Sequence, residues 1–129
     1  MTKKSELNQI RNKEKRESRI KETRNKVKAQ SFSSLMNNQK WHRVFEFVEQ
    51  HGSKFELKTL LSSRPKESDQ ILELEKSSIL MDHSGEFIEF LELEFLVLEN
   101  TTALINELEK FNIDYCEHSD FVKIFGYRK

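Results

Sequence analysis

The stretch that decides the fold is residues 71–98, which read ILELEKSSILMDHSGEFIEFLELEFLVL. Apolar and polar residues alternate along both halves of this stretch, which is the two-residue period of β-strands with one buried face. Between the halves, the segment Asp82 to Gly85 combines residue types that favour a tight turn. The sequence therefore predicts a β-hairpin formed by residues 71–81 and 86–98.

This turn would also set the register of the hairpin. If Met81 lies opposite Glu86, Leu74 faces Leu93 on one side of the sheet, as a single buried face requires. The other side then carries a rectangle of four carboxylates, in which Glu75 faces Glu92 and Glu73 faces Glu94. Because like charges directly opposite each other destabilise a sheet, we expect these four glutamates to bind a basic partner. The alternative is an ordinary solvated face that discourages aggregation at the sheet edge.

Outside this hairpin, the body of the chain (residues 31–129) is predicted to contain two helices and two more strands. Trp41, Val44, Phe45 and Val48 form one apolar helical face between an Asn37-Asn38 cap and Gly52. A strand over residues 55–61 follows, and then a polar loop over 62–69 in which Pro65 stops any strand pairing. A short helix begins after residues 100–101, and the last strand covers 121–127. We expect an α+β fold in the order α-β-β-β-α-β, with two helices on a single mixed, mainly antiparallel four-stranded sheet whose last strand is free to lie parallel to an earlier one.

Charge divides the chain into two parts. Residues 1–30 hold 11 Lys and Arg against 4 Asp and Glu, whereas residues 31–129 hold 11 against 18. The sequence therefore predicts a basic N-terminal arm over residues 1–30 and an acidic α+β domain over 31–129. The apolar residues of the arm form no continuous stripe, so we expect an exposed helix or a disordered segment.

Enzymatic chemistry has little support in this sequence. The three glycines are isolated, so no phosphate-binding loop is present, and no Ser or Cys lies in a nucleophile motif. Cys116 and His118 are close in sequence, but the chain has no second cysteine and no zinc-ligand spacing. We expect a protein that is not an enzyme and that uses no cofactor and no metal. The absence of a leader or a long apolar run predicts a cytoplasmic protein without a membrane partner.

Three kinds of binding remain open. In the first, the acidic face binds a basic protein, as an immunity-type or inhibitor protein binds a toxin nuclease. In the second, the arm binds nucleic-acid phosphates without sequence specificity. The residues for this are Lys13, Lys15, Arg16, Arg19, Lys21, Arg24, Lys26 and Lys28. In the third, the arm masks the acidic face, either in the same chain or in a homodimer.

Residues 35–41, Leu-Met-Asn-Asn-Gln-Lys-Trp, followed by an amphipathic helix, resemble the start of a family of small uncharacterised bacterial proteins. An Asn-Asn-Thr-Lys-Trp motif opens the domain in that family, and Gln39 stands here in place of the threonine. Residues 90–95 and 123–127 are similar to its later strands, with Phe95 in place of a tryptophan. The resemblance covers residues 31–127 and implies a compact bacterial α+β protein without a known activity.

Overall fold

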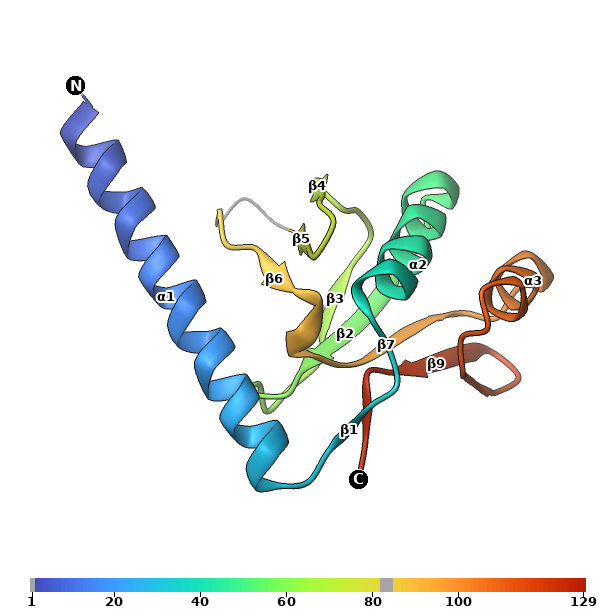
Figure 1. The fold of residues 1–129 in the computed structure, drawn as a ribbon. Coiled ribbons are helices and arrows are strands. Elements are labelled where there is room, and N and C mark those ends of the chain that lie inside the picture. The colour runs from blue at the N-terminus through green and yellow to red at the C-terminus, as the bar shows by residue number, and fades with distance from the viewer. Residues whose placement is uncertain (1, 82–84) are drawn as a thin grey trace.

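The computed structural model describes residues 2–81 and 85–129 and has an α+β architecture (Figure 1). Its helices are α1 (Thr2–Ala29), α2 (Asn38–His51), α3 (Thr102–Lys110) and the 3-10 helix η1 (Phe90–Glu92). Its strands are β1 (Ser33–Ser34), β2 (Phe55–Thr59), β3 (Lys66–Ser68), β4 (Glu73–Leu74), β5 (Ser78–Leu80), β6 (Ile88–Glu89), β7 (Leu93–Glu99), β8 (Cys116–Glu117), β9 (Phe121–Phe125) and β10 (Tyr127–Arg128). The predicted α+β class is confirmed. The single four-stranded sheet is wrong, because these strands form sheets of five, three and two strands.

The largest sheet has the strand order β3-β2-β7-β9-β8, and all of its pairings are antiparallel. Helices α2 and α3 cover one face of it, where Phe45 and Leu104 join a core with Leu57 and Leu96. The sequence allowed the last strand, β9, to lie parallel to an earlier strand, but it lies antiparallel to both of its neighbours. The connection from β7 through α3 leaves and re-enters the sheet at one end, where the Asn100 amide donates to the Asp120 carbonyl over 3.2 Å.

Helices α2 and α3 form where local sequence signals predict them. The Asn37 side chain caps α2 by accepting from the Lys40 amide at 2.8 Å, and Gly52 ends the helix with a φ of 59° in the left-handed region. Thr101 caps α3 in the same way, through the amide of Leu104 at 3.1 Å. Both helices bury one apolar face, as the spacing of their apolar residues requires.

The predicted hairpin of residues 71–98 is confirmed only next to its turn, where Ile79 lies opposite Ile88 in the register that a Met81–Glu86 closing pair sets. Its predicted extension to the outer parts of residues 71–98 is wrong. Strands β4, β5 and β6 instead form a small sheet of their own, with Glu73 opposite Leu80 and Ser78 opposite Glu89. Strand β7 leaves this sheet and pairs with β2 and β9. Helix η1 separates the two sheets, and it begins with a capping box in which Glu92 Oε2 accepts from the Glu89 amide at 2.8 Å. The predicted turn over residues 82–85 falls mainly on residues 82–84, which lie outside the described residues.

The polar segment that was expected to be a loop contains strand β3. It pairs with β2 at the edge of the large sheet, so that Glu56 lies opposite Glu67. Pro65 directly precedes β3 instead of preventing it, which is compatible with an edge strand because proline is tolerated at the first residue of such strands.

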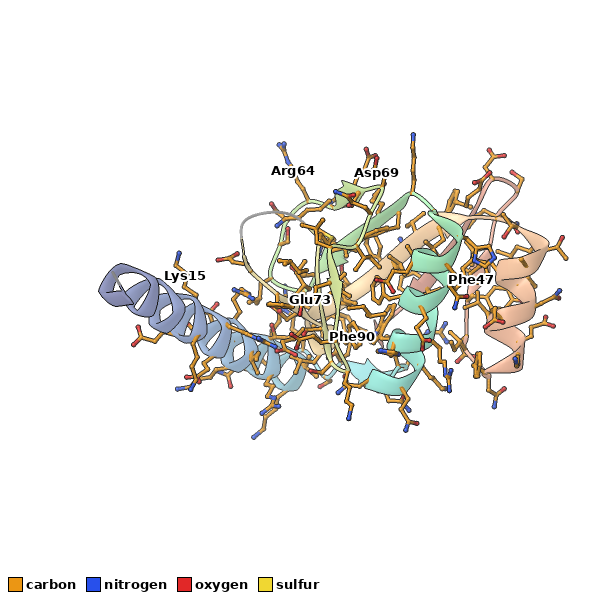
Figure 2. All side chains as sticks on the ribbon, turned by 90° about the horizontal axis from the view of Figure 1, so that it is seen from above. Lys15, Phe47, Arg64, Asp69, Glu73 and Phe90 are labelled. Carbon is orange, nitrogen blue, oxygen red and sulfur yellow. The ribbon has the colours of Figure 1, made fainter. Side chains whose placement is uncertain are left out.

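The basic arm is the 28-residue helix α1. Its C-terminal half lies beside the body and its N-terminal half extends away from it (Figure 1). Figure 2 shows Lys15 on this extending part, with its side chain clear of the body. On the docked part, the inward positions follow the helical spacing but are mostly polar: Arg16, Arg19, Ile20, Thr23, Lys26 and Val27.

Candidate functional site

The structure separates the four glutamates that were predicted to form a rectangle. Glu73 and Glu75 are exposed in and after β4, and Glu73 lies opposite Leu80. Glu92 is only 2 % exposed in η1, and Glu94 forms an ion pair with Lys58 at 2.7 Å. The rectangle is therefore a wrong prediction, because the predicted register is formed between β5 and β6 but does not extend to these glutamates. Glu92 and Glu94 are both occupied by cations of their own chain.

Two glutamates of the body bind the arm. Arg19 Nε donates to Glu92 Oε1 over 3.0 Å, and Arg19 Nη2 donates to the Phe87 carbonyl over 2.7 Å. One turn away, Arg16 forms an ion pair with Glu89, which is also buried. An intrachain contact between the arm and acidic residues is thus present, although at Glu89 and Glu92 and not on an exposed face.

The eight basic residues expected to bind phosphates are divided between two sides of α1. Arg16, Arg19 and Lys26 face the body, where Lys26 Nζ donates to the Leu60 carbonyl over 2.6 Å. The other five are exposed: Lys13, Lys15, Lys21, Arg24 and Lys28. Three exposed glutamates interleave with them: Glu14, Glu17 and Glu22. Over residues 13–28, the net positive charge that α1 presents to solvent is therefore smaller than the sequence of this segment indicates.

An acidic groove lies on the outer face of the large sheet, opposite α2 and α3. It encloses about 600 Å³ across β3, β2, β7 and β9. Four carboxylates line it: Glu56, Glu67, Asp69 and Glu99. The lining also includes Lys54, Val97 and Phe121, and Phe121 is 37 % exposed. We call this surface the acidic groove.

The carboxylates of the acidic groove form no ion pair within the described part of the chain, although Lys54 also lines the groove. No ion pair or side-chain hydrogen bond joins any of them to another of the described residues. Glu56 and Glu67 are direct cross-strand partners, which destabilises a sheet by about 0.2–1 kcal/mol. This like-charge pair was not predicted from the sequence and involves none of the four glutamates that were expected to face one another.

Next to the groove, the same sheet face is aromatic. Phe95 and Phe125 are cross-strand partners whose ring centroids lie 6.4 Å apart in an edge-to-face arrangement. The Lys123 ammonium lies 4.1 Å from the Phe95 centroid and 4.9 Å from the Phe125 centroid, and so makes a cation–π contact with each ring. A partner seated on this face would meet carboxylates at one end and aromatic rings at the other.

Two histidines and one tyrosine contact neighbouring side chains of the chain. His42 Nδ1 lies 2.8 Å from Glu46 Oε1, and His118 stacks on Phe121 with centroids 4.3 Å apart. A hydrogen bond to Glu109 raises the pKa of Tyr115 above its usual range. Across residues 13–81 and 85–129, whose side chains the structure describes, no three His, Cys, Asp or Glu side chains gather in a way that could hold a metal ion. In residues 2–81 and 85–129, no helix is both long and apolar enough to cross a bilayer.

The fold and the groove together define a small α+β protein with an acidic sheet face and a docked basic helix. Residues 23–129 match the model of a family of unknown function, DUF6678, and the chain belongs to this family. A search of curated proteins and a search of solved structures found no match.

Proposed function

We propose that this chain is a non-enzymatic protein-binding module whose acidic groove receives a basic segment of a partner protein. The observation that carries the proposal is the group of four carboxylates that form no ion pair with any of the described residues. Two of them, Glu56 and Glu67, lie opposite each other across β2 and β3, which lowers stability. A cationic partner would relieve this repulsion on binding and would be steered toward the groove.

The chemistry of the groove is that of a small inhibitor or immunity-type protein. Such a protein uses carboxylates to occupy the basic substrate surface of its target, as in the inhibition of a nuclease. The exposed ring of Phe121 and the neighbouring Phe95–Phe125 pair offer the aromatic contacts that dominate binding energy at many protein interfaces. We therefore expect the partner segment to contain both basic and apolar residues.

Reversing two charges at the edge of the groove tests this proposal. We expect Glu67→Lys with Asp69→Lys to weaken binding of the co-purified partner by about 100-fold, which corresponds to about 2.7 kcal/mol. Both side chains are exposed on or next to the edge strand, and the substitution at position 67 places a cation opposite Glu56. Thermal stability should therefore stay unchanged or rise slightly. Affinity purification from the native host after nuclease treatment, followed by calorimetry with the captured protein, measures the effect.

The control is Glu73→Lys with Glu75→Lys, which makes the same charge change at two exposed glutamates outside the groove. These variants should bind the partner as the original chain does. Equal losses in both double variants would show that overall charge, and not the groove, governs binding. A loss of partner binding in the control variant alone would place the binding site at β4 and not in the acidic groove.

A second candidate is non-specific binding of nucleic acid by the outer side of α1. The observation in its favour is that exposed cations lie on a helix that extends away from the acidic body (Figure 2). If the five exposed basic residues each contact a phosphate, affinity for duplex DNA should fall about 500-fold between 50 and 200 mM salt. Fluorescence polarisation measures this. Absence of binding at the lower salt concentration would reject the candidate and leave the acidic groove as the binding site.

A further inference from the structure

A cavity between α1 and the C-terminal strand is separate from the acidic groove. It measures about 520 Å³ and is lined by Thr23, Arg24, Lys28, Phe32, Leu91 and Tyr127, among others. The first three belong to the docked part of α1, and Phe32 lies in the segment that links α1 to β1. None of the described residues that line it has a carboxylate side chain.

Thr23 supplies an unused polar group to this cavity. The residue is 0 % exposed, and its Oγ1 has no hydrogen-bond partner among the described residues. Buried hydroxyl groups in folded proteins almost always have a partner, so an unpaired one needs an explanation. Since Thr23 also lines the cavity, a bound molecule is a chemically suitable partner for its hydroxyl.

The cations beside Thr23 are likewise unpaired. Arg24 and Lys28 are exposed, and neither forms an ion pair with any part of the chain that the structure describes. They are four residues apart on one helix, a spacing at which like charges repel. A third cation, Lys129, lies over the Phe32 ring at 5.3 Å from its centroid. Positive charge therefore gathers around this opening, and no carboxylate of the described lining balances it.

The remaining wall of the cavity is apolar and held in place. Phe32 and Tyr127 meet edge to face with centroids 6.1 Å apart, and the Tyr127 hydroxyl donates to the Leu91 carbonyl over 2.5 Å. Burial raises the pKa of Tyr127, an effect that nearby Arg24 partly opposes. The phenol stays protonated at neutral pH, and its hydrogen bond keeps the aromatic wall in position.

We infer that this cavity binds a small organic anion. Its acidic group, a carboxylate or a phosphate, lies between Arg24 and Lys28, and its flat apolar part packs against Phe32 and Leu91. The Thr23 hydroxyl donates the additional hydrogen bond. The inference rests on the cavity and its unpaired groups and does not depend on the acidic groove.

Titration calorimetry on the full chain tests the inference with three probes: benzoate, phenyl phosphate and the neutral benzamide. We expect one-to-one binding of at least one of the two anions with a dissociation constant of about 1 mM, as suits so small a ligand. Benzamide has nearly the shape of benzoate without its charge and should bind at least 10-fold more weakly. The two anions distinguish a carboxylate site from a phosphate site.

Two sets of variants locate the binding. Arg24→Gln with Lys28→Gln should lower the affinity at least 10-fold, whereas Lys13→Gln with Lys15→Gln makes the same charge change on the extending part of α1 and should have no effect. Thr23→Val should lower the affinity about 3-fold without lowering the melting temperature, since it removes an unpaired hydroxyl. Absence of saturable binding by both anions would overturn the inference. Equal losses in the two double variants, or equal binding of benzamide, would overturn it as well.

Discussion

Replacing Gly126 with alanine is expected to destabilise this protein by about 3 kcal/mol and to lower its melting temperature by about 10 °C. A Cβ atom at this position would overlap the backbone carbonyl oxygen of Leu93 and lie 3.3 Å from Cζ2 of Trp41. The backbone cannot move away easily. The Gly126 amide donates to the Glu94 carbonyl at 2.8 Å, and its carbonyl accepts from the Leu35 amide at 2.9 Å. Thermal denaturation followed by circular dichroism measures the change.

Gly52→Ala is the matched control for this prediction. Gly52 has a positive φ of 59°, but a Cβ atom added there would meet only open space. The substitution should therefore cost only the backbone strain, about 1 kcal/mol. A Gly126 variant no less stable than the Gly52 variant would show that the junction of β7, β1 and α2 is looser than the structure indicates.

Replacing Arg19 with methionine is the second change for which we expect a large effect, a loss of about 3 kcal/mol in the free energy of unfolding. Methionine keeps much of the apolar stem but removes the ion pair to Glu92 at 3.0 Å and the bond to the Phe87 carbonyl at 2.7 Å. Glu92 is left as a buried carboxylate whose remaining side-chain bond is the one from the Glu89 amide. Urea denaturation measures the loss, and limited proteolysis within α1 should become faster as the helix detaches.

A double-mutant cycle separates the lost charge pair from lost packing. Glu92→Gln keeps an oxygen that can accept from the Glu89 amide but removes the charge. Arg19→Met should therefore cost at least about 1 kcal/mol less in the Glu92→Gln background than alone. Lys21→Met, at an exposed position of the same helix, should change stability by no more than about 0.5 kcal/mol. Additive effects in the cycle would mean that Arg19 stabilises the protein through its hydrocarbon stem.

The parts of the fold that could be predicted from sequence are those with local causes. Helix α2 has its cap, its apolar face and its terminal glycine within residues 37–52, and it forms as predicted. The hairpin was predicted too long, because the segment that contains Glu89 and Glu92 was included in one continuous strand over residues 86–98. The same two glutamates form the capping box of η1, which ends one sheet before the next begins. Alternation alone does not distinguish these outcomes.

The candidate sites were harder to predict because they depend on contacts between distant segments. Strand β3 is three polar residues long and has no apolar alternation of its own, so the pairing of Glu56 with Glu67 had no signal in the sequence. The docking of α1 was predicted only as one of three alternatives, and its contact residues were not predicted, for a different reason. Arginines occupy the inward positions where a search for an apolar stripe requires Leu or Ile, and their partners lie 73 residues away.

The ion pairs between α1 and η1 also affect which N-terminal residues the protein needs in order to fold. The family match starts at Thr23, after both arginines that neutralise Glu89 and Glu92. A chain cut at that boundary would keep only the last two turns of α1, too short to persist as a helix on its own, and would hold two buried carboxylates without a cation. We therefore expect the homologous region and the autonomous folding unit to have different N-terminal boundaries, with the second at least as far upstream as Arg16.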